Sequence, residues 1–148
     1  MEDDRWEAAL DRVLAVTVLL SRDMADSLAR MGLTEARTHL IWELRALGPC
    51  PQRALASALH VTPRAVTALV DGLAETGFVT REPNPADRRA TLVTFTEKGR
   101  ATAQALGDGH RELARQLFAG MPAGEFDGFD AGLNHVLDRL RALLAKSP

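Results

Sequence analysis

The sequence predicts a mostly α-helical α+β fold that contains one small β-hairpin. Alanine, leucine and arginine are abundant and tyrosine is absent, a composition that favours helices. Apolar residues recur at three- and four-residue spacing along most of the chain, and only two short segments show the alternation typical of strands. With 148 residues, 46% of them hydrophobic and 26% charged, we expect one domain, or one domain with extensions.

Two helices are expected in the N-terminal third of the chain. A long amphipathic helix should run from Asp4 to about Arg30, because apolar residues recur there every three or four positions, and Gly32 ends it. The second helix should begin after Thr34, whose side chain can cap a helix N-terminus. The segment GPCP (48–51) stops this second helix.

The middle of the chain predicts two short helices joined by a tight turn. The first covers about Gln52 to Leu59, and the second follows at once. Thr62 can accept a backbone N–H, and Pro63 fits the first helical position, where no N–H is needed, so the proline begins this helix. Gly77 ends it. Its inward face is apolar and consists of Val66, Leu69, Val70 and Leu73.

The chain then changes to a strand pattern. FVTR (78–81) and ATLVTF (90–95) are predicted to form a β-hairpin around the polar tip EPNPADRR. Thr96 should cap a further helix that continues to about Phe118. A loop is expected from Gly120 to Phe126, and a last amphipathic helix from Phe126 to about Ala145.

Two short helices followed by a hairpin constitute a winged helix-turn-helix, in which the second helix enters the major groove of DNA. The outer face of the predicted second helix suits this role, because its side chains are short and include one arginine. Arg64 can recognise guanine through two hydrogen bonds, Thr62 and Thr67 can bind phosphate or contact a thymine methyl, and Ala68 leaves room for the DNA. Asp71 is one turn further on, where the helix should leave the groove.

The hairpin tip adds two further cations, Arg88 and Arg89, on a narrow loop that suits a minor groove. We interpret Asp87 as a brace that fixes an arginine by a paired hydrogen bond. The predicted DNA-contacting residues are Thr62, Pro63, Arg64, Thr67, Ala68, Arg81, Arg88 and Arg89.

The charge pattern is compatible with nucleic-acid binding. The net charge is −2, but residues 53–100 hold seven basic and five acidic residues, whereas both ends are acidic. An ordinary solvated surface gives the same count, so the charge alone does not distinguish a DNA-binding surface from a solvated one. A single cysteine, an acidic N-terminus and no apolar run longer than VLAVTVLL (13–20) predict a cytoplasmic protein without membrane segments.

Other function classes lack their motifs. No phosphate-binding glycine loop, nucleophile elbow or metalloprotease pair is present, so we expect neither an enzyme nor a cofactor. Glu35 and His39 are four residues apart, but no second pair accompanies them, and no metal site is expected. Cys50 could serve as a redox switch only if its thiol were exposed and acidic.

Three segments resemble the MarR family of bacterial transcriptional regulators. LTEARTHLIWEL (33–44) resembles the helix that enters the DNA-binding lobe, and LASALHVTPRAVTALVDGLAETGFVTR (55–81) the helix-turn-helix. DRRATLVTFTEKG (87–99) is similar to the family's wing signature, in which Asp87 and Arg89 fill the Asp-x-Arg positions. Phe95 replaces the usual leucine.

The resemblance implies a homodimer, whose dimerisation helices would lie in residues 1–31 and 119–148. Residues 32–99 would form the winged helix-turn-helix and residues 100–118 a connecting helix. The resemblance also implies a repressor of a pseudo-palindromic operator that is released by a small, often aromatic or phenolic, ligand, although sequence does not distinguish a repressor from an activator.

The ligand would bind between the dimerisation region and the DNA-binding lobe. Side chains that could line this pocket are Trp6, Met31, His39 and Trp42, although the same residues suit an ordinary core. A second interpretation remains open: a ligand-binding or protein-interaction module that kept the fold and lost specific DNA binding.

Overall fold

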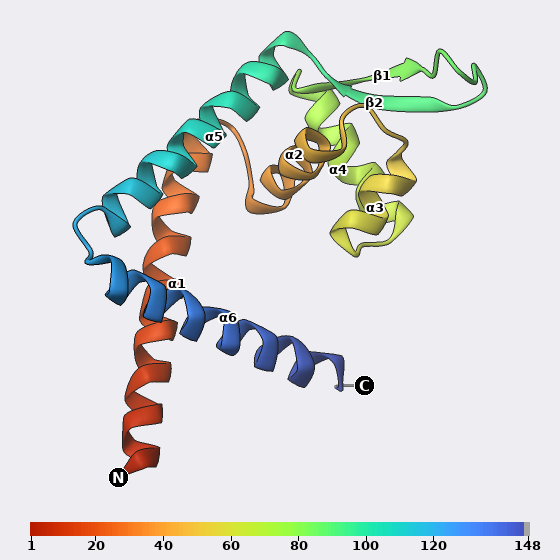
Figure 1. The fold of residues 1–148 in the computed structure, drawn as a ribbon. Helices are drawn as coiled ribbons and strands as arrows, with labels where there is room; N and C mark the ends of the chain where they lie inside the picture. Colours follow the sequence, from red (N-terminus) through yellow and green to blue (C-terminus); the bar gives the residue numbers. More distant parts are fainter. Residues whose placement is uncertain (147–148) are drawn as a thin grey trace. The chain divides into compact units, whose positions relative to one another are not determined.

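The computed structural model describes residues 1–146 and has the mostly helical fold that the sequence predicts (Figure 1). The last two residues of the predicted C-terminal segment 119–148 lie outside the described part. The elements in chain order are α1 (Glu2–Arg30), α2 (Glu35–Leu47), α3 (Gln52–Leu59), α4 (Pro63–Glu75), β1 (Val79–Pro83), β2 (Thr91–Phe95), α5 (Glu97–Phe118) and α6 (Ala123–Ala145).

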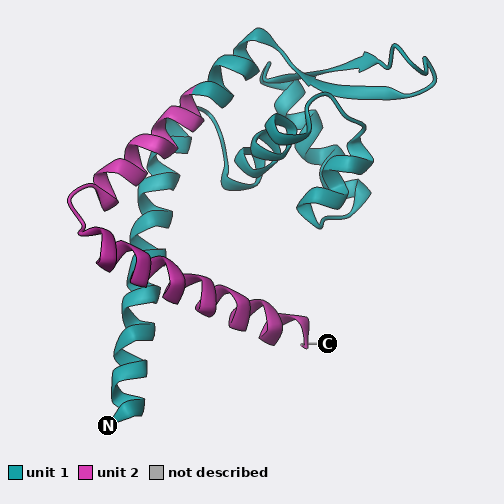
Figure 2. Cartoon of the chain, in the orientation of Figure 1, with its two compact units in different colours: residues 1–104 teal, residues 105–148 magenta. Residues whose placement is uncertain are grey.

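The chain divides into two compact units, residues 1–104 and residues 105–148 (Figure 2). The first unit holds α1 to α4, the two strands and the start of α5. The second holds the rest of α5 and α6. All features proposed below to contact DNA lie in the first unit.

The core of the first unit joins α2, α3, α4 and the hairpin. Its fully buried side chains are aliphatic apart from Thr38, whose hydroxyl donates to the Thr34 carbonyl at 2.8 Å. Burial of each such aliphatic side chain contributes roughly 1.5–3 kcal/mol. The largest members of this core are Leu40, Ile41, Leu44, Leu55, Val66, Val70, Leu73 and Val93.

The hairpin is antiparallel, with Val79 opposite Phe95 and Pro83 opposite Thr91. Cys50, just before α3, forms an isolated bridge with Val93 on β2, in which both backbone N–H groups donate to the opposite carbonyls at 3.2 and 2.8 Å. The middle of β2 is therefore attached to the segment that leads into the helix-turn-helix.

The predicted helix starts in the first unit are confirmed by their capping bonds. Thr34 accepts the Arg37 N–H at 3.2 Å, and Thr96 accepts the Gly99 N–H at 3.0 Å. After α4, Gly77 adopts a φ of +83°, a conformation that costs little for glycine. These ends were predictable because capping depends on neighbouring residues alone.

In the second unit, the prediction for the last loop was wrong. α6 begins at Ala123, three residues earlier than expected, directly after Pro122 as N-cap. The Phe126 ring packs edge-on against Phe118 with the centroids 5.4 Å apart, and Phe129 lies 5.9 Å from the same ring. The Phe126 N–H donates to the Pro122 carbonyl at 3.0 Å, so Phe126 already lies within the helix and not at its beginning.

Candidate nucleic-acid interface

The start of α4 has the geometry that its sequence predicts. Thr62 is the N-cap, with extended backbone angles, and its side-chain oxygen accepts the Ala65 N–H at 3.1 Å. Pro63 occupies the first turn, where it removes no hydrogen bond. The chain therefore enters α4 in a fixed direction, and the side chains of the first turn have defined positions.

The two faces of α4 differ in burial. Val66, Val70 and Leu73 are at most 1% exposed, whereas Leu69 is half-buried. The opposite face is exposed and carries Arg64, Thr67, Ala68 and Asp71. A rigid helix thus presents one arginine and short side chains to solvent, as close approach to a base edge requires.

Arg81 on β1 has partners within the chain, although we predicted it to contact DNA. Its Nε donates to Gln52 Oε1 at 2.9 Å, and its Nη2 lies 2.5 Å from Asp71 Oδ1. The side chain of Arg81 is 34% exposed, and the side chain of Asp71 is 54% exposed. The guanidinium therefore connects the first strand of the wing to α3 and to α4.

The structure adds Gln52, the first residue of α3, which sequence reasoning missed. Its Oε1 accepts from Arg81 and its Nε2 donates to Thr67 Oγ1 at 3.0 Å. Thr67 in turn donates to the Pro63 carbonyl at 2.9 Å. We call Gln52, Thr67, Asp71 and Arg81 the α3–α4–wing network. Only the polar character of Gln52 at a helix start could have suggested it.

The wing tip is shaped by its own backbone hydrogen bonds. Asn84 N–H donates to the Ala90 carbonyl, and Asn84 Oδ1 accepts the Ala86 N–H. Asp87 Oδ1 accepts the Arg89 backbone N–H at 3.1 Å, which is not the paired hydrogen bond with an arginine side chain that we predicted. Arg88 and Arg89 are exposed, and neither forms an ion pair within residues 1–146.

Comparison with known proteins identifies the family of this helix-turn-helix. A family model described as MarR family matches residues 33–91. The multiple antibiotic resistance protein MarR of Escherichia coli is 32% identical over 103 residues, which cover 66% of this chain and 72% of that protein. The uncharacterized HTH-type transcriptional regulator ML2140 of Mycobacterium leprae is 30% identical over the whole of both chains. The chain belongs to the MarR family.

A solved MarR-like structure has the same fold. A mutant of MepR from S. aureus, bound to an oligodeoxyribonucleotide, superposes with a TM-score of 0.65, covering 90% of this chain and 96% of that one, at 21% identity. The predicted winged-helix fold is thus confirmed, and the chain is a MarR-family transcriptional regulator. Relatives such as ML2140 are named as transcriptional regulators rather than enzymes, which is consistent with the lack of a catalytic motif.

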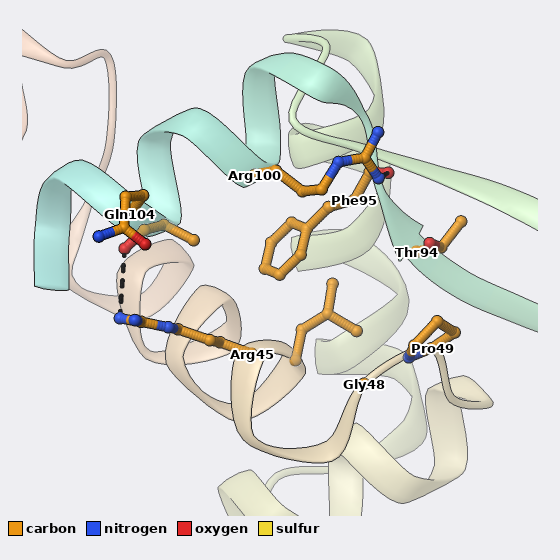
Figure 3. Close-up of a pocket in the computed structure, with 9 residues that line it drawn as sticks. Arg45, Gly48, Pro49, Thr94, Phe95, Arg100 and Gln104 are labelled. Atoms are coloured by element: carbon orange, nitrogen blue, oxygen red, sulfur yellow. Dashed lines mark hydrogen bonds between the residues drawn. The ribbon is translucent and has the colours of Figure 1, made fainter.

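A cavity of about 370 Å³ opens between the end of α2, the end of β2 and the start of α5 of this MarR-family chain. Figure 3 shows the Phe95 ring pointing into it, with the Arg100 guanidinium beside the Phe95 backbone carbonyl and the Arg45 guanidinium directed toward α5. Arg45 donates to the Ala103 carbonyl at 3.5 Å, and Arg100 to the Phe95 carbonyl at 3.0 Å. The lining residues include two cations and no acid.

The four residues predicted for a ligand pocket do not gather in one place within the chain. Trp6 is near the start of the continuous helix α1 and Met31 is its C-cap, so about 37 Å of helix separates them at a rise of about 1.5 Å per residue. His39 and Trp42 are on α2. All four side chains can line one pocket only if a second copy of the chain contributes some of them. The ligand pocket therefore remains a prediction.

The other sensor types find little support. Cys50 is buried, 7% exposed, and burial raises the pKa of its thiol, which disfavours the reactive thiolate. Within residues 1–146 there is no group of three His, Cys, Asp or Glu side chains that could hold a metal ion. Among the helices in that same range, none is long and apolar enough to cross a membrane.

Proposed function

We propose that this MarR-family regulator is a homodimeric repressor that binds a pseudo-palindromic operator through α4 and the wing, and that a small ligand releases it. The observation that carries the DNA-binding half is the exposed face of α4, where Arg64 stands in the first turn beside short side chains. Thr62, Pro63, Thr67 and Ala68 would complete the contact with the major groove.

The wing would contribute the sequence-independent part of the affinity. Arg88 and Arg89 are exposed cations without acidic partners in the described part of the chain, so each can neutralise a phosphate or enter a minor groove. Arg81 differs from them, because two of its N–H groups are used within the protein. We therefore assign Arg81 a positioning role at the interface.

The dimer proposal is supported by apolar surface on the two terminal helices. On α1, Trp6 is 65% exposed and Leu19 64%, and α6 has no buried residue at all although it carries eight leucine, valine and phenylalanine side chains. Monomeric proteins rarely expose contiguous apolar surface of this kind. Residues 1–31 and 119–148 would form the dimerisation region, 32–99 the DNA-binding domain and 100–118 the connection.

The effector half of the proposal is supported by the α2–β2–α5 cavity. Its volume lies within the range of small-molecule sites, and a lining that combines the Phe95 ring with Arg45 and Arg100 suits a ligand with an apolar body and an anionic group. A ligand there would contact both the end of β2 and the start of α5, and so could change the position of the wing.

The test is a titration of the protein into labelled DNA from upstream of its own gene, followed by anisotropy at near-physiological salt with non-specific competitor. Saturable binding that survives the competitor and weakens as salt rises supports the proposal. Binding no tighter than to random DNA at several upstream sequences favours the alternative, a ligand-binding or protein-interaction module. Release of bound DNA by benzoate or phenol, but not by matched ionic strength, supports the effector.

A further inference from the structure

The hydroxyl groups of Thr62 and Thr67, on the exposed side of α4, form different sets of hydrogen bonds. Thr62 Oγ1 accepts the Ala65 N–H, and within residues 1–146 its own proton has no acceptor. That proton is available for an outside acceptor, such as a phosphate oxygen. Thr67 Oγ1 instead accepts from Gln52 Nε2 and donates to the Pro63 carbonyl. A hydroxyl has one proton, so Thr67 has none left to donate.

The state of Thr67 follows from the chemistry of its neighbours. A guanidinium has only donors, so the Gln52 atom that faces Arg81 Nε must be the amide oxygen. The amide nitrogen of Gln52 then faces Thr67, and Thr67 Oγ1 must accept there. The Thr67 proton is thus directed to the Pro63 carbonyl. Asp71 pairs with Arg81 and holds its guanidinium where it donates to Gln52.

The consequence concerns what Thr67 can offer to DNA. Phosphate oxygens are acceptors only, and so are the purine N7, guanine O6 and thymine O4 positions in the major groove. Thr67 is exposed but cannot donate to any of them in this arrangement. Two groups of Thr67 remain: its methyl group, whose apolar counterpart in the major groove is the C5-methyl of thymine, and one lone pair of Oγ1, which can accept from the amino group of adenine or cytosine only.

We propose that Thr67 recognises a thymine through a methyl–methyl contact, and that Gln52 and Arg81 are positioning residues that keep its hydroxyl occupied. This inference rests on the proposed operator binding by α4. It gives the two threonines separate roles: Thr62 donates to a phosphate, and Thr67 selects thymine over a base that lacks the methyl group.

The experiment uses a duplex selected by the wild-type protein from a random-sequence library. Each thymine of one half-site is replaced singly by deoxyuridine, which lacks only the C5-methyl, and affinity is measured by anisotropy. For the wild type we expect about fourfold weaker binding at one position, the equivalent of one buried methyl group. Thr67→Ser should abolish this thymine preference, and Thr67→Val, which keeps a methyl group, should retain it.

Thr76→Ser at the C-cap of α4 is the matched control, because it makes the same chemical change at another threonine whose hydroxyl donates to the carbonyl four residues earlier, and it should leave the thymine preference intact. Gln52→Ala should reduce the preference, whereas a merely structural role of Gln52 would weaken binding to both duplexes equally. An unchanged fourfold preference in Thr67→Ser overturns the inference, as does the lack of any deoxyuridine effect in the wild type. If the wild type selects no sequence, the proposed function itself fails.

Discussion

Gly99, in the first turn of α5, lies against Phe78 in the segment between α4 and β1, and we predict that Gly99→Ala is strongly destabilising. A Cβ atom at this position would lie 1.8 Å from the Phe78 carbonyl oxygen, whereas real Cβ contacts stay above 3.0 Å. The obstacle is backbone, so no rotamer change relieves it. Relief requires a separation of about 1.2 Å between the start of α5 and Phe78.

The cost can be worked from the contacts that such a shift would disturb. Overpacking in a well-packed region costs typically about 1–3 kcal/mol. The shift also strains the hydroxyl of Thr96, which accepts the Gly99 N–H and donates to the Gly77 carbonyl at 2.5 Å. Loss of such a cap costs about 1 kcal/mol. We therefore expect Gly99→Ala to lower the free energy of unfolding by about 3 kcal/mol.

The assay is urea unfolding followed by far-UV circular dichroism, at one fixed protein concentration. With a slope of about 2 kcal/mol/M, the midpoint should fall by about 1.5 M. Gly109→Ala is the control on the same helix, since a Cβ there meets nothing within 4 Å. It should raise stability by up to about 1 kcal/mol through helix propensity. Equal midpoints for Gly99→Ala and the wild type would refute the close-contact argument.

Further predictions concern DNA binding, assembly and the thiol. Arg64→Ala should cost about 1–3 kcal/mol of operator binding and relax base preference, and unchanged values in a base-substitution scan would remove Arg64 from the base contacts. Arg89→Ala should weaken specific and non-specific DNA binding alike and reduce the slope of log affinity against log salt by roughly 1. An unchanged slope would mean that the wing does not touch phosphate. Deletion of Met1 to Leu20 should give monomers or insoluble protein, and a soluble dimer in light scattering would contradict this. Because burial raises the pKa of the Cys50 thiol, iodoacetamide should modify it faster in urea than in the folded protein at the same pH; equal rates would argue for an accessible thiolate.

The helix-turn-helix could be predicted from sequence because its signals are local. Thr62 and Pro63 determine the start of α4 through a cap and a fixed φ, both within one turn. The same reasoning located the cap at Thr34. It misplaced the start of α6, because the glycine at position 124 was taken as part of a loop, whereas the Phe126 N–H already forms a helical hydrogen bond with the Pro122 carbonyl.

The role of Arg81 could not be predicted in this way. Gln52 and Arg81 are 29 residues apart, and their contact depends on the register of the hairpin and on how α3 packs against α4. From sequence, Arg81 was predicted to contact DNA together with the other cations of the wing. Asp71 was expected where α4 leaves the groove. Their ion pair depends on the three-dimensional arrangement of two elements, which no pattern along the chain contains.

This ion pair also gives a reason for an acidic side chain on the exposed face of α4, one turn beyond the residues that we propose to contact DNA. An isolated carboxylate near phosphate would be repelled, but the Arg81 guanidinium at 2.5 Å offsets its charge. The same guanidinium donates to Gln52 Oε1, and the Gln52 amide nitrogen in turn donates to Thr67 Oγ1, whose own proton goes to the Pro63 carbonyl. Under the proposed function, Asp71 would therefore contribute to recognition without touching DNA. Asp71→Asn should leave the fold intact, because the pair is exposed and worth little in stability, yet it should weaken the thymine preference through Arg81 and Gln52.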